Sequence, residues 1–157
     1  MDSPSRSDGD FACFVIRDED DSPQRYPLIR LLRSVDHALG GEVRDWRVMR
    51  LWGQGLRTGR LEDRVNEIEL GDDIIVTTEL LLSLDRDPNE WFYDVIIRTL
   101  DRSLSLGIFD SGFMFVEGPA GVARAAAAPF ELVEEAEGQI DTDRPPSGDL
   151  APEETRR

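Results

Sequence analysis

Apolar and polar residues recur along the chain in spacings that predict its first elements. Residues 11–16 are almost all apolar, which predicts a short strand covered on both faces. Between Leu28 and Leu39 the apolar residues fall on one side of a helix, with Pro27 in the first turn and Gly40 and Gly41 at the C-terminal cap. The beginning of the chain therefore predicts a buried strand followed by an amphipathic helix.

Two longer patterns predict the middle of the chain. Residues 74–84 alternate between two faces, as in a long antiparallel strand, and a turn is expected just before them. From Asp87 to Leu106 the apolar residues return to helical spacing, with Asp87 as the N-cap, Pro88 in the first turn and Gly107 at the end. This second segment predicts an amphipathic helix.

The end of the chain predicts more strand. Residues 113–116 form a short strand followed by a Gly-Pro turn, and 122–136 predict a last strand or strand pair, bent or at an edge because of Pro129. We therefore predict an α+β fold with a single antiparallel or mixed sheet packed against two amphipathic helices. Residues 1–9 are expected to be a flexible arm, 10–136 one domain, and 137–157 an acidic, proline-rich tail.

Charge changes how short acidic runs are interpreted. The chain of 157 residues has a net charge of -15, from 33 acidic and 18 basic residues, and every basic residue is arginine. Acidic residues occur from end to end, which is typical of a halophilic or high-GC source whose surfaces stay hydrated in salt. The run Asp18 to Asp21 has the oxygen ligands that Mg²⁺ prefers. In so acidic a chain, however, a solvated connection is the better interpretation, and we expect no metal site.

The residues that most often do chemistry are few. His37, the single histidine, lies opposite the apolar stripe of the first helix, and the single cysteine, Cys13, lies inside the first strand. Catalytic triads and histidine-ligated zinc sites need an imidazole held in a cleft. We therefore expect a protein that is not an enzyme. No apolar stretch or signal peptide predicts membrane insertion or secretion, so a virion or the cytoplasm is the expected location.

Gly53, Gly55 and Gly59 are reminiscent of a dinucleotide-binding turn. That motif needs a hydrophobic strand within a βαβ unit, whereas the strand expected here carries Arg47 and Arg50. A flexible or hairpin loop is the better interpretation, and no cofactor is expected.

A local concentration of arginines is the strongest candidate for a binding surface. One interpretation is a surface strand and loop with incidental salt bridges. The other is a docking patch, because arginine pairs with carboxylates and phosphates bidentately and is enriched with tryptophan at interface hot spots. A protein partner is expected rather than a nucleic acid. The arginines are Arg44, Arg47, Arg50, Arg57, Arg60 and Arg64, and the candidate partner-binding residues are Arg47, Arg50, Arg57, Arg60, Trp46 and Trp52.

The expected element order is a helix, a hairpin with a long strand, a second helix and closing strands. Over Pro27 to Glu135 this order resembles that of the tail-terminator and neck (tail-completion) proteins of tailed viruses. The resemblance implies a structural subunit that assembles with copies of itself and with neighbouring structural proteins. It lies in element order alone, so it implies no residue roles, and the strand at 11–16 departs from it.

A second class of binder remains open. An acidic inhibitor, such as a toxin-immunity protein or a nucleic-acid mimic, would use its negative field to attract a basic partner. It would gather its carboxylates on one face, whereas a salt-adapted structural protein would spread them.

Overall fold

The first strand and the first helix form where the sequence predicts them. The computed structural model describes residues 10–19, 27–41, 45–66, 74–87, 89–109 and 112–136. β1 (Phe11–Ile16) is buried on both faces except at Phe11, and α2 (Leu28–Ala38) buries its predicted apolar stripe while His37 is exposed. The predicted arm and tail, 1–9 and 137–157, lie outside the described residues.

The seven described strands form one sheet, in the order β3-β2-β4-β5-β6-β1-β7, and each neighbouring pair is antiparallel. The other six strands are β2 (Asp45–Gln54), β3 (Ile74–Thr77), β4 (Trp91–Thr99), β5 (Ser105–Phe109), β6 (Phe113–Pro119) and β7 (Val133–Ala136). The predicted α+β class and single sheet are confirmed. β1, the first strand in the sequence, lies between β6 and β7, which are the last two.

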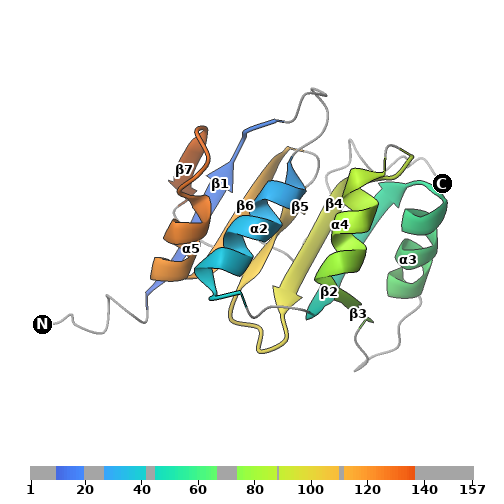
Figure 1. The fold of residues 1–157 in the computed structure, drawn as a ribbon, viewed down its shortest axis with the longest axis horizontal. Helices are drawn as coiled ribbons and strands as arrows, with labels where there is room; N and C mark the ends of the chain where they lie inside the picture. The colour runs from blue at the N-terminus through green and yellow to red at the C-terminus, as the bar shows by residue number, and fades with distance from the viewer. Residues whose placement is uncertain are drawn as a thin grey trace, which may run out of the picture.

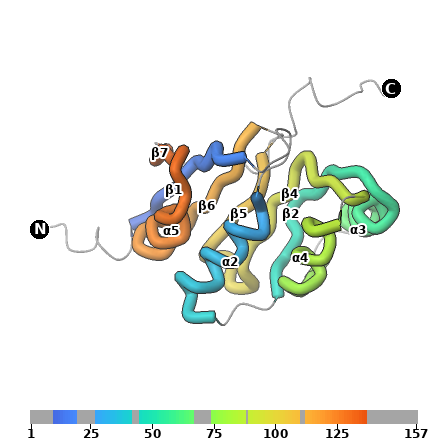
Figure 2. The backbone as a smooth tube through the Cα atoms, turned by 45° about the horizontal axis from the view of Figure 1, so that its top comes forward, coloured from blue at the N-terminus to red at the C-terminus, as the bar shows by residue number. Residues whose placement is uncertain are grey.

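The helices in the described part of the chain number four, rather than the two predicted, and lie on the same side of the sheet (Figures 1 and 2). Buried residues from every one of them join the same apolar core, which the sheet shares through residues such as Val95, Ile97 and Val116. The remaining three helices are α3 (Leu56–Asn66), α4 (Thr78–Arg86) and α5 (Ala120–Ala127).

α2 ties this helical layer together. It connects β1 to β2, which lie in different halves of the sheet, and contacts both α4 and α5 (Figure 1). The Asp85 carboxylate of α4 accepts a hydrogen bond from the backbone N–H of Ile29 at 3.2 Å, at the N-terminal end of α2 where N–H groups need partners. The Ser34 hydroxyl of α2 donates to the Ala126 carbonyl of α5 at 2.6 Å.

The long strand predicted over 74–84 is wrong beyond Thr77. Only β3 is extended, and the chain then turns into α4, whose first turn is capped by the Thr77 hydroxyl accepting from the Leu80 N–H at 3.0 Å. Leu81 and Leu84 are buried at helical spacing. A run rich in leucine satisfies both periods, so the cap decides between them.

The second predicted helix, from Asp87 to Leu106, is also wrong. This segment forms β4, a turn and the start of β5. Its aromatic and β-branched residues favour a strand, and the turn is held by the Asp101 carboxylate, which accepts from the N–H of Ser103 at 2.9 Å and from the hydroxyl of Thr99 at 2.7 Å. These hydrogen bonds lower the pKa of Asp101.

Two further segments differ from the prediction. The expected loop around Gly55 to Gly59 is the first turn of α3, and most of the predicted strand after Val122 is α5, so that only β7 remains extended there. β6 starts where predicted, but it runs on through Pro119, so the expected Gly-Pro turn is part of the strand. The element order that carried the resemblance to tail-completion proteins is therefore not the observed order.

Asp18 is more than part of a solvated connection. Its carboxylate accepts a hydrogen bond from the Leu132 N–H at 2.7 Å and further bonds from the Glu131 N–H, which fixes the approach to β7. Glu19 is exposed, and Asp20 and Asp21 lie outside the described residues. Among the described residues, no group of three or more histidine, cysteine or acidic side chains is placed to hold a metal ion.

We expect Asp18→Ala to loosen β7, because two exposed backbone N–H groups lose their carboxylate acceptor, at a cost of about 0.5–1.5 kcal/mol per hydrogen bond. Hydrogen exchange of residues 131–136 should speed up, while exchange in β4 stays unchanged. Glu19→Ala is the matched control and should have no effect. Equal protection of β7 in both variants would show that Asp18 does not fix this strand.

Candidate functional site

The face of the sheet opposite the helices, here called the helix-free face, has its own composition. Along the strands, side chains alternate between the two faces. Ile96, Phe109 and Phe115 form a second, smaller apolar cluster together with Met49 and Phe113, and all five of these residues come from strands. This face is turned away from the viewer in Figure 1.

Two rows of side chains run across the strands on this face. In one row Arg47 lies opposite Arg98, which is followed by Ser105, Glu117 and Cys13 on the next three strands. In the other, Arg50 lies opposite Ile96, and Gly107, Phe115 and Val15 follow. The first row is polar and the second is mostly apolar.

Arg50 is bound into the sheet rather than offered to solvent. Its guanidinium lies 2.6 Å from the Asp94 carboxylate and 4.9 Å from the centre of the Phe109 ring. The Asp94 side chain is 0% exposed and that of Arg50 is 11% exposed. Nε and Nη2 of Arg50 both donate to Oδ2 of Asp94, so two charge-assisted hydrogen bonds hold the buried carboxylate.

Aromatic side chains lie at one end of the same face. Trp52 lies opposite Asp94, and Trp91 lies opposite Gln54. The Trp91 and Tyr93 rings are 6.4 Å apart, and the Tyr93 hydroxyl donates to the Gln54 side chain at 2.6 Å. All three aromatic residues are half-buried.

Arginines gather at the other edges of the face. Arg17 lies over the Phe113 ring at 5.4 Å, and Arg47 and Arg98 lie side by side and half-buried. Arg47 Nε donates to the Leu100 carbonyl at 3.0 Å, and Arg98 Nε donates to the Ser105 hydroxyl at 2.8 Å. The helix-free face therefore combines arginine, tryptophan and tyrosine, the residue types that dominate interface hot spots.

The structure divides the predicted arginine patch between two surfaces. Arg47, Arg50 and Trp52 share the helix-free face, whereas Arg57 and Arg60 lie on α3 in the helical layer. There Arg57 donates to the Ser83 hydroxyl and lies 3.6 Å from the Asp87 carboxylate, and Arg60 is exposed.

One other member of the prediction belongs to neither surface. Trp46 is 1% exposed in the helical-side core, where its indole N–H donates to the Thr78 hydroxyl at 2.8 Å, so it is not accessible to a partner in this conformation. Arg44 lies outside the described residues.

Sequence reasoning missed four contributors to this face: Asp94, Tyr93, Arg98 and Phe109. Asp94, Tyr93 and Arg98 fall within the predicted helix, and the signal that places them on a strand instead is the aromatic and β-branched composition of residues 91–99. Phe109 follows that helix and has no role in the prediction. Trp91, also in residues 91–99, lies half-buried on this face.

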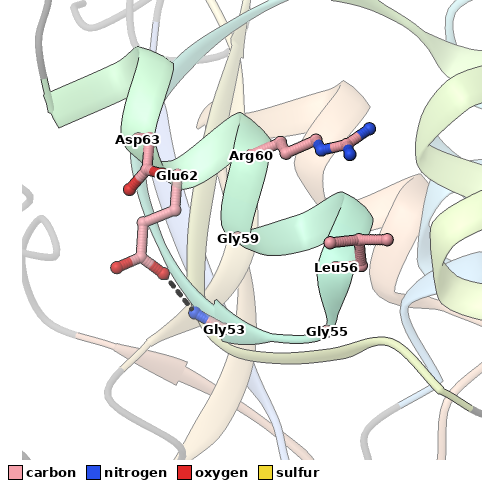
Figure 3. Close-up of a pocket in the computed structure, with 7 residues that line it drawn as sticks. All are labelled: Gly53, Gly55, Leu56, Gly59, Arg60, Glu62 and Asp63. Atoms are coloured by element: carbon pink, nitrogen blue, oxygen red, sulfur yellow. Dashed lines mark hydrogen bonds between the residues drawn. The ribbon is translucent and has the colours of Figure 1, made fainter.

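The glycine turn between β2 and α3 is a second candidate. A shallow pocket here is lined by Gly53, Gly55, Leu56, Gly59, Arg60, Glu62 and Asp63 (Figure 3). The Glu62 carboxylate reaches back to accept from the Gly53 N–H at 3.0 Å, while Arg60 points away from it (Figure 3).

An anion already lies at the N-terminus of α3. The buried Glu90 carboxylate accepts from the Thr58 N–H at 2.7 Å and from the Arg57 N–H at 3.3 Å. A phosphate at this position would meet a negative charge. Gly55 is needed here because its backbone has φ of +118° and a Cβ would run into the Glu90 carboxylate.

Glu90 should make stability fall in acid. Burial raises the pKa of its carboxyl, but the contacts with Thr58 and Arg57 outweigh burial, and the pKa is lowered from its ordinary value of 4.5. The stabilisation is therefore present above that value and lost as pH falls through the lowered pKa. In denaturant titrations, Glu90→Gln should make the acid-side loss of unfolding free energy shallower.

Glu62 is the control because its pKa is shifted in the opposite direction. Burial raises this pKa, the hydrogen bond from the Gly53 N–H lowers it, and the nearby charge of Asp63 raises it further. Protonation of Glu62 favours the folded state, so Glu62→Gln should make the acid-side loss steeper. The same slope change in both variants would contradict the assignment of Glu90.

The described residues carry less of the acidity than their share of the chain. They contain 12 of the 18 arginines and 17 of the 33 acidic residues, a net charge of -5 out of the total of -15. The excess of acidic over basic residues is therefore larger in the segments between and beyond the described elements than within them.

Searches of protein-family models, curated proteins and solved structures found no match to this chain. No helix in the described part of the chain has the length and apolar character needed to cross a membrane.

Proposed function

We propose that this protein is a non-enzymatic binding subunit of a larger assembly, which docks an acidic, extended protein segment on the helix-free face. A second copy of the chain or a neighbouring structural protein would supply that segment. The proposal does not rest on the resemblance to tail-completion proteins, because the observed element order is different.

The pairing of Arg47 with Arg98 carries the proposal. Two guanidinium groups lie side by side on this face, in a protein whose net charge is -15. Arginine binds carboxylates in a bidentate geometry, so this pair suits a carboxylate-rich ligand. The neighbouring Trp52 and Trp91 would supply the aromatic anchors that such interfaces use.

The described carboxylates favour this function over an acidic inhibitor. Three of them make contacts within the protein: Asp18 and Glu90 accept hydrogen bonds from backbone N–H groups, and Asp94 is paired with Arg50. An inhibitor that works through its negative field needs carboxylates turned toward its partner.

The test uses a fluorescein-labelled poly-Glu peptide and fluorescence anisotropy at low salt. Arg47→Glu combined with Arg98→Glu should weaken binding about tenfold or more, because two contacts become repulsive. Binding by the wild type should weaken as KCl rises, since salt screens exposed charges.

Arg33→Glu combined with Arg64→Glu is the matched control. Both arginines are exposed on helices, and the change in net charge is the same. Its affinity should stay near that of the wild type. Equal loss in the two double variants would mean that overall charge, rather than the helix-free face, governs binding, and the proposal would fail.

A further inference from the structure

The two edges of the sheet carry most of the exposed large apolar side chains. Phe11 and Leu132 are 47% and 61% exposed and lie at the β7 edge, formed by β7 and β1. Leu56 and Ile75 are 69% and 43% exposed and lie at the β3 edge, formed by β3, β2 and the α3 helix that packs on β2. One other large apolar residue in the described part of the chain is exposed, Leu100 in the turn after β4. β7 and α3 lie at opposite ends of the longest axis of the molecule (Figure 1).

The β7 edge is acidic. Residues 131–136 carry three exposed glutamates and no arginine, and the exposed Leu132 lies among them. The backbone N–H of Arg17 donates to the Leu132 carbonyl at 2.8 Å, but the guanidinium of this arginine lies over the Phe113 ring. The three glutamates are Glu131, Glu134 and Glu135. An apolar side chain is therefore surrounded by negative charge at this edge.

The β3 edge presents the opposite charge. Two arginines of the predicted patch, Arg57 and Arg60, are exposed on α3, where Arg60 lies one turn after the exposed Leu56. Further along the helix the exposed Asp63 and Arg64 offset each other. β3 itself contains no charged residue. The start of α3 therefore combines an apolar side chain with positive charge, in a chain whose net charge is -15.

The direction of the strands places the matching features at the same height on the two edges. Four antiparallel steps separate β2 from β1 in the sheet, so these two strands run in the same direction. Leu132 lies at the C-terminal end of β1, and Leu56 follows the C-terminal end of β2. Phe11 begins β1, and Ile75 pairs near the beginning of β2. When one copy is placed beside another along the sheet, Leu132 therefore approaches Leu56, and Phe11 approaches Ile75.

We infer that copies of this chain associate head to tail, with the β7 edge of one copy against the β3 edge of the next. Leucine at the centre and glutamate–arginine pairs around it give the apolar core and polar rim of a specific interface. A second copy is favoured over another partner because both complementary edges belong to the same chain and carry their features in the same order. A head-to-tail contact leaves one edge of each kind uncovered, so association continues past a dimer. The contact does not use the helix-free face and does not rest on the proposed function.

Sedimentation velocity at increasing protein concentration tests the inference, and the wild type should form species larger than a dimer. The basic-edge variant carries Arg57→Glu and Arg60→Glu, and the acidic-edge variant carries Glu131→Arg and Glu134→Arg. Each should associate at least tenfold more weakly, because like charges then face each other across the contact. The acidic-edge variant is the sharper test, since it lowers the net negative charge of the chain, which by itself favours association.

Exchanging the charges of both edges should restore association. A chain with all four substitutions has complementary edges again, and so does an equimolar mixture of the two variants. The matched control is Arg33→Glu with Arg102→Glu, because both arginines are exposed away from the two edges and the change in net charge equals that of the basic-edge variant. This control should associate like the wild type.

Several results would overturn the inference. One is a wild type that stays monomeric at every concentration or stops at a dimer. Another is a chain with all four substitutions that is folded by circular dichroism and still monomeric. If the basic-edge variant does not fold, unchanged association of the acidic-edge variant overturns the inference. Association that is lost with Arg47→Glu and Arg98→Glu, but not in the edge variants, would place the contact on the helix-free face and overturn it as well.

Discussion

Arg50→Ala should remove about 3–5 kcal/mol from the free energy of unfolding, one of the two largest losses that we expect from a single substitution. It leaves the Asp94 carboxylate, which is 0% exposed, without the guanidinium that donates two hydrogen bonds to it. Breaking a buried ion pair from one side is costly because an uncompensated charge stays buried. Urea denaturation followed by circular dichroism measures the loss.

The double variant Arg50→Met with Asp94→Leu separates the charge from the packing. Replacing both partners by apolar residues of similar size is often neutral or stabilising, so this protein should be much closer to the wild type than Arg50→Ala is. A double variant as unstable as the single one would show that the pair acts through its shape or through further contacts. Charge reversal at Arg50 is therefore a test of folding, whereas reversal at Arg47 and Arg98 is a test of docking.

Gly107→Ala should cost about 3 kcal/mol or more, because a side chain has no room at this position in the centre of the sheet. A Cβ on Gly107 would overlap the backbone carbonyl of Val95 and lie 3.1 Å from Cα of Ile96. Both obstacles are backbone atoms of β4, so relief requires the strands to move apart. Thermal and urea unfolding measure the change.

The controls for Gly107 have the opposite sign. Gly59 and Gly121 lie in α3 and α5, and an added Cβ meets no atom within 4 Å at either position. Alanine is favoured over glycine in a helix by about 1 kcal/mol, so Gly59→Ala and Gly121→Ala should stabilise the protein. If Gly107→Ala is as well tolerated as these two, the close approach of β4 and β5 is not rigid.

The elements that could be predicted are those in which residue composition and the spacing of apolar residues indicate the same secondary structure. β1 and β6 are short apolar runs, and α2 has an apolar stripe with a glycine cap, so composition and spacing lead to the same element. In residues 80–84 the leucines satisfy both periods, and the Thr77 cap was needed to choose the helix. Spacing alone favoured a strand there.

β4 was mistaken for a helix for a different reason. Its pairing with β2 is interrupted near Trp52 and again near Arg50, so two strands that would alternate cleanly carry an extra residue at each point. Such bulges bring neighbours such as Met49 and Arg50 to one face and break the period of two. The same irregularity hid Asp94 and Arg98, which is why the sequence identified only one strand of the candidate site, through Arg47, Arg50 and Trp52.

The place of β1 in the sheet sets the order in which the protein can fold as it is synthesised. β4, β5 and β6 are consecutive in the chain and pair with each other, so they can assemble as soon as residues 91–119 are available. β1 is made first, but it pairs with β6 and β7, roughly a hundred residues later. Contacts so distant in sequence form slowly because a long loop must close. On the ribosome the apolar strand Phe11–Ile16 must therefore wait unpaired until almost the whole chain has emerged, and this wait makes it the segment that a chaperone would be expected to bind.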